Sequence, residues 1–233
     1  MYNWRLLSFR LTLLSTLLFL VLAHLAMWLY EGGTIHNHEL TSYSFTYNFF
    51  SDLGRNHRPG GGDNFPSNLI FKTALTLTGA CIALFFAALP GIFKSENARS
   101  VAALATLFGV AAGVCYIGIG LVPYDESYGG HRLFVRSGFI SFLVMSLLFA
   151  FAIFLEKGYP KRYAWALLLF SVVRFSQILL MVLGDRSWRS NDALWRQATA
   201  QKVVVYAEIL CMIYQTVGVL RYVKAPRKKP GNL

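Results

Sequence analysis

The sequence has few charged residues for its length, and acidic residues are the scarcest among them. Charged residues make up 14% of the 233 positions, with 11 acids against 22 bases, whereas a soluble domain carries about 25% charged residues. Apolar residues make up 55% and gather in long runs, which is typical of membrane-crossing segments. The sequence therefore excludes an ordinary soluble domain and predicts an integral membrane protein.

Cysteine and the familiar catalytic motifs are scarce or missing as well. Cys81, Cys115 and Cys211 each lie inside an apolar run, and their spacing gives neither a disulfide framework nor a C-x-x-C pair. The chain has no H-E-x-x-H, P-loop, G-x-S-x-G or EF-hand signature, so no motif assigns an activity. We predict no cofactor and no bound metal.

Six apolar runs are long enough to cross the hydrocarbon layer, which is about 30 Å thick, as helices rising 1.5 Å per residue. They cover residues 9–30, 69–93, 99–122, 133–155, 162–184 and 200–222. The first run is about 20 residues long, beyond the 7–15 of a signal peptide, and no A-x-A site follows it, so we interpret it as an uncleaved helix. The sequence predicts one all-α domain, residues 1–233, folded as a six-transmembrane-helix bundle.

The basic residues predict how this bundle lies in the membrane. Six spans put both termini on one side, where twelve of the 22 Lys and Arg residues lie in short connections and tails. The positive-inside rule then places both termini in the cytoplasm, with the basic tail from Arg221 as an anchor at an anionic leaflet. The net charge of +11 is thus a topology signal and no nucleic-acid footprint. We expect a multi-pass protein of a prokaryotic inner or plasma membrane.

The connections on the predicted outer side are much longer than those on the inner side. They have about 38, 10 and 15 residues, against five to seven inside, and long loops usually have a functional reason. The longest, residues 31–68, contains the polar stretch "YNFFSDLGRNHRPGGGDNFPSN". We expect it to form a structured lid, in which Ser51 and Asp52 either cap neighbouring amides or take part in chemistry.

Two charged residues, Arg174 and Glu208, lie deep within predicted spans. Arg174 is about 15 Å from the outer end of its span at 1.5 Å per residue, and Glu208, about eight residues from the same side, has a similar depth. Each alone costs several kcal/mol in hydrocarbon. Their shared depth predicts an ion pair, which is either a clamp between two helices or the floor of a polar cavity. Gln177, Met181 and Asp185 continue one helical face from Arg174 to the outer surface, and this polar stripe favours a cavity that is open to the outside.

The second outer loop adds Asp125, His131 and Arg136. Together with the first loop they would supply hydroxyl, carboxylate, imidazole and guanidinium groups, which suit acid–base or nucleophilic chemistry or the binding of a phosphate. The same groups suit an ordinary hydrogen-bonded loop equally well. The candidate catalytic residues are Asp52 and His131, and the candidate substrate-binding residues are Ser51, Arg55, Asp125, Arg136, Arg174, Gln177, Asp185 and Glu208.

Two further patterns leave alternatives open. The loop histidines His36, His38 and His57 have spacing that only weakly suggests a metal site. Gly109 and Gly113 form a small-xxx-small pair in the third span, which indicates close helix packing within the chain or in a homo-oligomer.

The stretch "NFFSDLGR" at positions 48–55 resembles two groups of membrane proteins. One is a family of uncharacterised bacterial and archaeal proteins, classed as a domain of unknown function, with an S-D-L-G element after the first span. The other, more distant, is the damage-regulated autophagy modulator and GPI-remodelling-like family, which has a similar S-D-x-G element and six spans. Ser51, Asp52, Gly54 and His131 carry the resemblance, and the insert 55–64 departs from the second group. The resemblance implies the six-span fold and no established activity.

These observations predict a polar pocket made by the last three spans and covered by the loop 31–68. We expect it to bind a lipid-like, amphipathic substrate, with membrane lipids as partners, and either to modify the substrate or only to bind it. The alternatives are a non-catalytic lipid sensor or membrane-organising protein, a proton-coupled transporter that uses Arg174 and Glu208 as a relay, and a metal-dependent hydrolase that uses the loop histidines.

Overall fold

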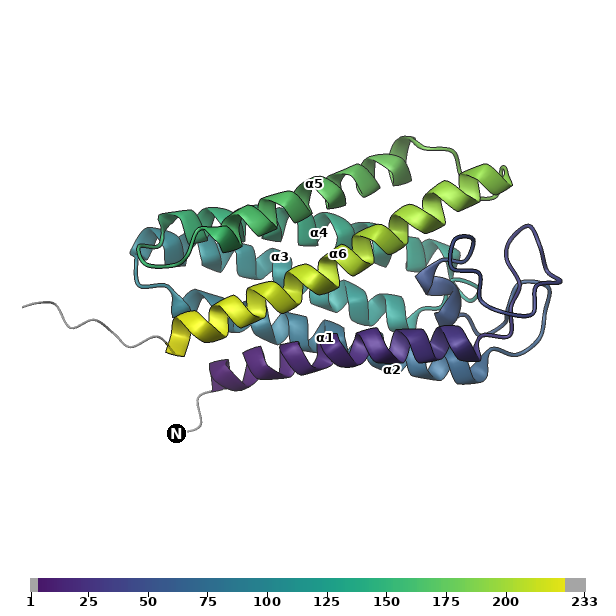
Figure 1. Cartoon of the computed structure of the whole chain (residues 1–233), viewed down its shortest axis with the longest axis horizontal. Helices are drawn as coiled ribbons and strands as arrows, with labels where there is room; N and C mark the ends of the chain where they lie inside the picture. Colours follow the sequence, from purple (N-terminus) through teal and green to yellow (C-terminus); the bar gives the residue numbers. More distant parts are fainter. Residues whose placement is uncertain (1–3, 225–233) are drawn as a thin grey trace, which may run out of the picture.

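The computed structural model describes residues 4–224, and within them it forms six long helices lying side by side, with no strand (Figure 1). The helices are α1 (Trp4–Leu29), α2 (Phe65–Ala88), α3 (Glu96–Leu121), α4 (Tyr128–Leu155), α5 (Arg162–Leu183) and α6 (Asn191–Lys224). Each is long and apolar enough to cross a membrane, so the all-α, six-span prediction is confirmed. The predicted tail anchor, with Arg227, Lys228 and Lys229, lies for the most part outside the described residues.

Every predicted span corresponds to one helix, but several helices begin before their apolar run. The largest difference is at α6, which begins at Asn191 instead of residue 200. Its first turn is stabilised by Ser190, whose Oγ accepts a hydrogen bond from Ala193 N at 3.1 Å, as an N-cap does. Apolar content marks the part of a helix that suits the hydrocarbon layer, whereas capping determines where the helix starts.

The glycines of α3 allow α2 to approach it closely. A Cβ placed on Gly113 would lie 2.5 Å from the carbonyl oxygen of Gly79, and one on Gly109 would overlap the ring of Phe86. The small-residue face of α3 is therefore covered within the chain, as close helix packing requires. A homo-oligomer through the third span stays a prediction, and it would have to use a part of α3 other than this face.

The α1–α2 connection lies at one end of the bundle, beside the end of α5 and the start of α6 (Figure 1). We call this the loop end; the start of α1 and the end of α6 lie at the opposite end. The short 3-10 helix η1 (Phe50–Gly54) forms within the connection. After it, Gly60, Gly61 and Gly62 have φ values of 88–95°, which only glycine adopts readily, and close a turn bridged by His57 and Asp63.

Side chains from several elements fix this loop in place. Asn68 Nδ2 of α2 donates to the carbonyl of Arg55 at 2.7 Å, and Gln201 Oε1 of α6 accepts from Phe50 N at 2.8 Å. His36 Nε2 lies 2.9 Å from the carbonyl oxygen of Ser187, in the connection between α5 and α6. The loop is thus a structured cover over the loop end, as the sequence predicts.

Candidate functional site

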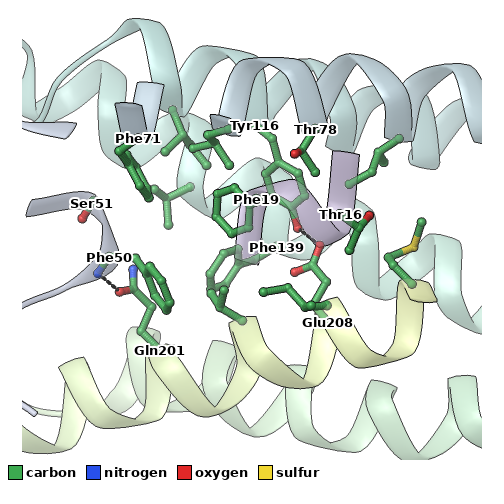
Figure 2. A pocket seen from close by; sticks show the side chains of 17 residues that line it. Thr16, Phe19, Phe50, Ser51, Phe71, Thr78, Tyr116, Phe139, Gln201 and Glu208 are labelled. Carbon is green, nitrogen blue, oxygen red and sulfur yellow. Dashed lines mark hydrogen bonds between the residues drawn. The ribbon is translucent and has the colours of Figure 1, made fainter. Parts of the chain in front are cut away.

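Two cavities adjoin beneath this cover. The loop-end cavity has a volume of about 200 Å³ and is lined by the first loop, α4, α5 and the start of α6. The inner cavity has a volume of about 90 Å³ and lies deeper in the bundle, among α1, α2, α3, α4 and α6 (Figure 2). Four residues line both cavities, and they are Ser51, Val135, Phe139 and Gln201.

The loop-end cavity brings together half of the residues that the sequence identifies as candidates. Its lining includes Ser51, Asp52, His131, Arg136 and Gln177. These residues come from η1 in the covering loop, from α4 and from α5. Gln201 of α6 also lines the cavity, so the loop and all three helices expected to form the pocket meet here. Arg55, Asp125, Arg174, Asp185 and Glu208 lie elsewhere.

Asp52 is buried at the edge of the loop-end cavity, with 5% of its surface exposed. Its Oδ2 accepts hydrogen bonds from Phe49 N at 2.8 Å and from Asn48 Nδ2 at 3.1 Å, and its Oδ1 lies 3.9 Å from Arg55. Burial raises the pKa of this carboxyl group, against the opposing effects of Arg55 and the two hydrogen bonds. Asp52 therefore holds the η1 turn through one oxygen and leaves the other beside Arg55.

His131 lies in the first turn of α4 and is 4% exposed. Its Nδ1 is 2.8 Å from the carbonyl oxygen of Val122, which can only accept, so Nδ1 carries the hydrogen. In the neutral ring, Nε2 is then an acceptor, and this buried atom has no hydrogen-bond partner among residues 4–224. The edge-on contact with Tyr124, at 5.9 Å between centroids, further fixes the ring. An imidazole held in one tautomer with a vacant nitrogen is suited to accept a proton.

Three arginines line the loop-end cavity, Arg132 and Arg136 from α4 and Arg186 after α5. None of them forms an ion pair with an acid in residues 4–224. Arg132 donates to Tyr128 OH at 2.7 Å, and Arg186 lies 5.1 Å from the Trp188 ring. The one acid in the lining is Asp52, so this cavity carries excess positive charge.

The inner cavity is lined mainly by apolar side chains, and most of its polar side chains already have hydrogen-bond partners within the protein. Tyr116 OH donates to Glu208 Oε1 at 2.5 Å, and Glu208 Oε2 accepts from Arg174. Figure 2 shows the Tyr116–Glu208 pair well away from Ser51 and Gln201, on the side of the cavity where Thr16 lies. The ion pair predicted from the shared depth of Arg174 and Glu208 is thus confirmed.

Arg174 itself lines neither cavity and is completely buried. Its guanidinium carbon lies 4.3 Å from the ring centre of Phe139, 5.2 Å from that of Phe170 and 5.4 Å from that of Phe142. Cation–π contacts of this kind stabilise a desolvated guanidinium. Phe139, which lines both cavities, packs on the guanidinium, and Glu208, which lines the inner cavity, pairs with it, so the geometry favours a clamp between α5 and α6 over the floor of a polar cavity.

The remaining three candidates stabilise the loop end from outside the cavities. Asp125 accepts from Asn56 N at 3.1 Å and from His57 N at 2.8 Å, and so ties the α3–α4 connection to the α1–α2 loop. Arg55 stacks on Tyr124 at 5.2 Å. Asp185 lies at the surface, where it pairs with two exposed arginines at 3.2 and 3.8 Å.

The loop histidines do not converge. His36 contacts the connection after α5, and His57 forms the bridge with Asp63. Residues 4–224 contain no group of three or more His, Cys, Asp or Glu side chains placed to hold a metal ion. The metal-dependent hydrolase therefore has no assembled ligand set in the described part of the chain.

Two buried polar residues near the site are not among the sequence candidates. Tyr116 interrupts the glycine-rich third span roughly 9 Å from its outer end, at 1.5 Å per residue, and a phenol at this depth indicates a polar partner. Lys202 lies near the start of the predicted sixth span, and because it is charged it is assigned to the outer surface instead of to the protein interior. In the structure it is 1% exposed, donates to the carbonyl of Asn48, and lies 5.3–5.7 Å from the rings of Tyr43, Phe45 and Phe50. It anchors the cover to α6.

Comparison with known proteins adds one finding. The model of the family described as "Protein of unknown function (DUF998)" matches residues 37–218, which include the covering loop and both cavities. Neither a curated protein nor a solved structure matches the chain.

Proposed function

The chain belongs to the DUF998 family, a family of unknown function, and we propose that this member binds an anionic amphipathic lipid. The headgroup, a phosphate or a carboxylate, occupies the loop-end cavity, and the acyl chain extends into the inner cavity. One observation carries the proposal, namely that a cavity lined by three arginines, none of them paired with an acid of residues 4–224, adjoins an apolar cavity.

The charge of the loop-end cavity supports an anionic ligand. A guanidinium is a strong donor to phosphate and carboxylate oxygens, and it binds them in a fixed fork geometry. Uncompensated positive groups on a partly enclosed wall also raise the local concentration of anions. A cationic or zwitterionic headgroup has less to gain here, because Asp52 already holds Phe49, Asn48 and Arg55.

The inner cavity supports an acyl chain. Phe19, Phe71, Ile82 and Met212 are among its lining residues, and its carboxylate is already bonded to a phenol and a guanidinium. Burying an apolar chain against such a wall gains about 0.8 kcal/mol per methylene. An ion or a polar solute would find few free donors or acceptors there, which disfavours the transporter alternative.

The charge distribution supports an orientation. Twelve of the 22 Lys and Arg residues belong, by sequence, to the tails and connections on the side of both termini, and by the positive-inside rule this supports a loop end outside the cytoplasm. The prokaryotic membrane and the distant likeness to the GPI-remodelling-like family stay predictions.

Binding measurements test the proposal. We expect the purified protein to bind phosphatidic acid or palmitate more tightly than phosphatidylcholine of the same chain length. Replacing Arg132, Arg136 and Arg186 together by Gln removes the excess charge, and each lost charge-assisted hydrogen bond costs about 1.5–3 kcal/mol, or roughly tenfold or more in affinity. Arg189→Gln, an exposed arginine already paired with Asp185, is the matched control. Equal affinity of the triple variant and the control would refute the proposal.

The vacant Nε2 of His131 favours a second candidate function, hydrolysis of an ester in the bound headgroup. His131 would take a proton from water as the water oxygen attacks, and would return it to the departing alkoxide. The test is incubation of phosphatidic acid or phosphatidylglycerol with the protein in ¹⁸O-labelled water, followed by mass spectrometry. Labelled product from the wild type and none from His131→Gln, with unchanged lipid affinity, would establish it; binding without product would leave a lipid-binding protein.

A further inference from the structure

A third hollow lies on the membrane-facing side of the bundle, between α1 and α2. It has a volume of about 140 Å³, and its lining includes Leu11, Leu14, Leu77 and Cys81. Leu14 is 61% exposed and Leu77 is 51% exposed, so in a membrane this α1/α2 groove is open to the lipid chains.

The groove shares two wall residues, Phe19 and Thr78, with the inner cavity. The Thr78 hydroxyl donates to the carbonyl of Ser15 at 3.2 Å, and the Ser15 hydroxyl to that of Thr12 at 3.1 Å. The polar atoms between the two spaces are therefore satisfied within the helices, which leaves an apolar boundary. The Phe19 ring, 6.1 Å from that of Phe71 and tilted by 54°, is the largest side chain at this boundary.

The size of the cavities gives a reason for the groove to matter. The loop-end and inner cavities hold about 200 and 90 Å³, each below the lower end, near 300 Å³, of typical small-molecule sites. A long acyl chain does not fit inside the protein and has to leave it. Resting on the function proposed above, we infer that the chain passes between α1 and α2, beside Phe19 and Thr78, and continues along the α1/α2 groove into the bilayer.

The direction of this path suits a lipid. Going from the loop end along α2, the chain meets Phe71 in the inner cavity, then Thr78 at the boundary and Cys81 in the groove. Thr78 is 13 residues into α2, which corresponds to about 20 Å along a helix. The headgroup therefore stays at the loop end while the chain runs toward the middle of the membrane, as in a lipid of the leaflet at that end.

A competing exit exists at the loop-end cavity itself. Val182 of α5 lines that cavity and is 63% exposed. A chain leaving there would reach the bilayer beside α5 without entering the inner cavity. The two routes place the chain against different helices, and this difference makes the inference testable.

The first experiment blocks the groove from its membrane side. Leu77→Trp enlarges an exposed side chain in the groove, and Leu84→Trp is the matched control, because Leu84 is similarly exposed on α2 and lines none of the three hollows. We expect Leu77→Trp to weaken binding of dipalmitoyl phosphatidic acid by about tenfold, since each buried methylene strengthens binding about fourfold. Dihexanoyl phosphatidic acid, whose chains end inside the protein, should bind the wild type and both variants equally.

The second experiment locates the chain directly. Phosphatidic acid with a diazirine at the end of one acyl chain is mixed with the protein in detergent and irradiated, and the modified peptides are identified by mass spectrometry. We expect adducts on the segments 11–19 and 74–82, and their loss in Arg136→Gln. Adducts confined to the region of Val182, or an equal effect of Leu77→Trp on both lipids, would overturn the path while leaving the headgroup site intact. If the wild type binds neither lipid, the proposed function fails and the path falls with it.

Discussion

Arg174 and Arg136 lie in the same bundle but differ in burial and in pairing. Arg174 is fully buried, bonded to Glu208 and Tyr116, and enclosed by three phenylalanine rings. Arg136 is exposed at the wall of the loop-end cavity and forms no ion pair within residues 4–224. A buried charge whose partner is supplied by the protein serves the fold. A charge at a cavity wall without a partner is available to a ligand.

The same comparison applies to the two cavities. In the inner cavity, Tyr116 and Glu208 already bond to each other. In the loop-end cavity, His131 Nε2 and Gln177 Oε1 are buried without a hydrogen-bond partner in the described part of the chain. Buried polar atoms are normally satisfied, so an unpaired atom of a cavity-lining residue is available to a polar ligand or to water. The Nε and Nη1 of Arg174 also have no hydrogen-bond partner within residues 4–224, but Arg174 lines neither cavity and lies against phenylalanine rings.

The largest effect should come from breaking the buried pair. Glu208→Gln leaves Arg174 charged and without its partner, and removing one member of a buried ion pair costs about 3–5 kcal/mol. We expect a correspondingly lower free energy of unfolding in detergent. The double replacement Glu208→Met with Arg174→Met removes both charges and should be much less damaging. Equal stability of Glu208→Gln and the wild type would contradict a structural role for the pair.

The next largest effect should be on binding. Arg136→Gln removes one donor to the proposed headgroup, and we expect affinity for phosphatidic acid to fall by roughly tenfold to a hundredfold, from about 1.5–3 kcal/mol per charged hydrogen bond. The free energy of unfolding should stay within about 0.5 kcal/mol, as for other surface substitutions. Isothermal titration calorimetry gives the affinity, and chemical unfolding in the same detergent gives the stability. A loss of stability without a loss of affinity would place Arg136 with Arg174 as a structural residue.

A smaller effect concerns the pH dependence of stability. Burial raises the pKa of Asp52 above its ordinary value of 3.8, so the folded protein holds this proton more tightly than the unfolded chain does. The stability that this contributes is present at low pH and is lost as the pH rises from near 3.8 through the raised value. Asp52→Asn should remove this part of the pH dependence, measured as unfolding free energies between pH 4 and 8. Identical pH profiles of the variant and the wild type would show that Asp52 is not the titrating group.

The smallest effect should come from the exposed ion pairs. Asp185 lies at 3.2 Å from Arg189 and 3.8 Å from Arg196, and exposed pairs contribute about 0.2–1 kcal/mol. We expect Asp185→Asn to change stability by less than about 1 kcal/mol and to leave lipid affinity unchanged. A tenfold change in affinity would mean that the binding site extends to Asp185, as the polar stripe from Arg174 to Asp185 predicts.

Much of the fold follows from the sequence because each membrane span needs a long apolar run, and the Arg174–Glu208 pair follows because buried charges at equal depth require each other. The site could be predicted only in part. Asp52 and His131 reach the same cavity, but Arg55 and Asp125, equally polar and equally close in sequence, bind the loop instead. Sequence position gives the loop of a residue and not the direction of its side chain. Arg132 and Arg186 were missed for the same reason.

A competition experiment tests the central claim most directly. The purified protein is mixed with equal amounts of phosphatidic acid and phosphatidylcholine with identical chains, and the lipid that stays bound is identified by native mass spectrometry. The account predicts at least about a tenfold preference for phosphatidic acid, the equivalent of 1.4 kcal/mol, and its loss when Arg132, Arg136 and Arg186 are all replaced by Gln. Equal occupancy by the two lipids, or a preference that the triple variant retains, would contradict it.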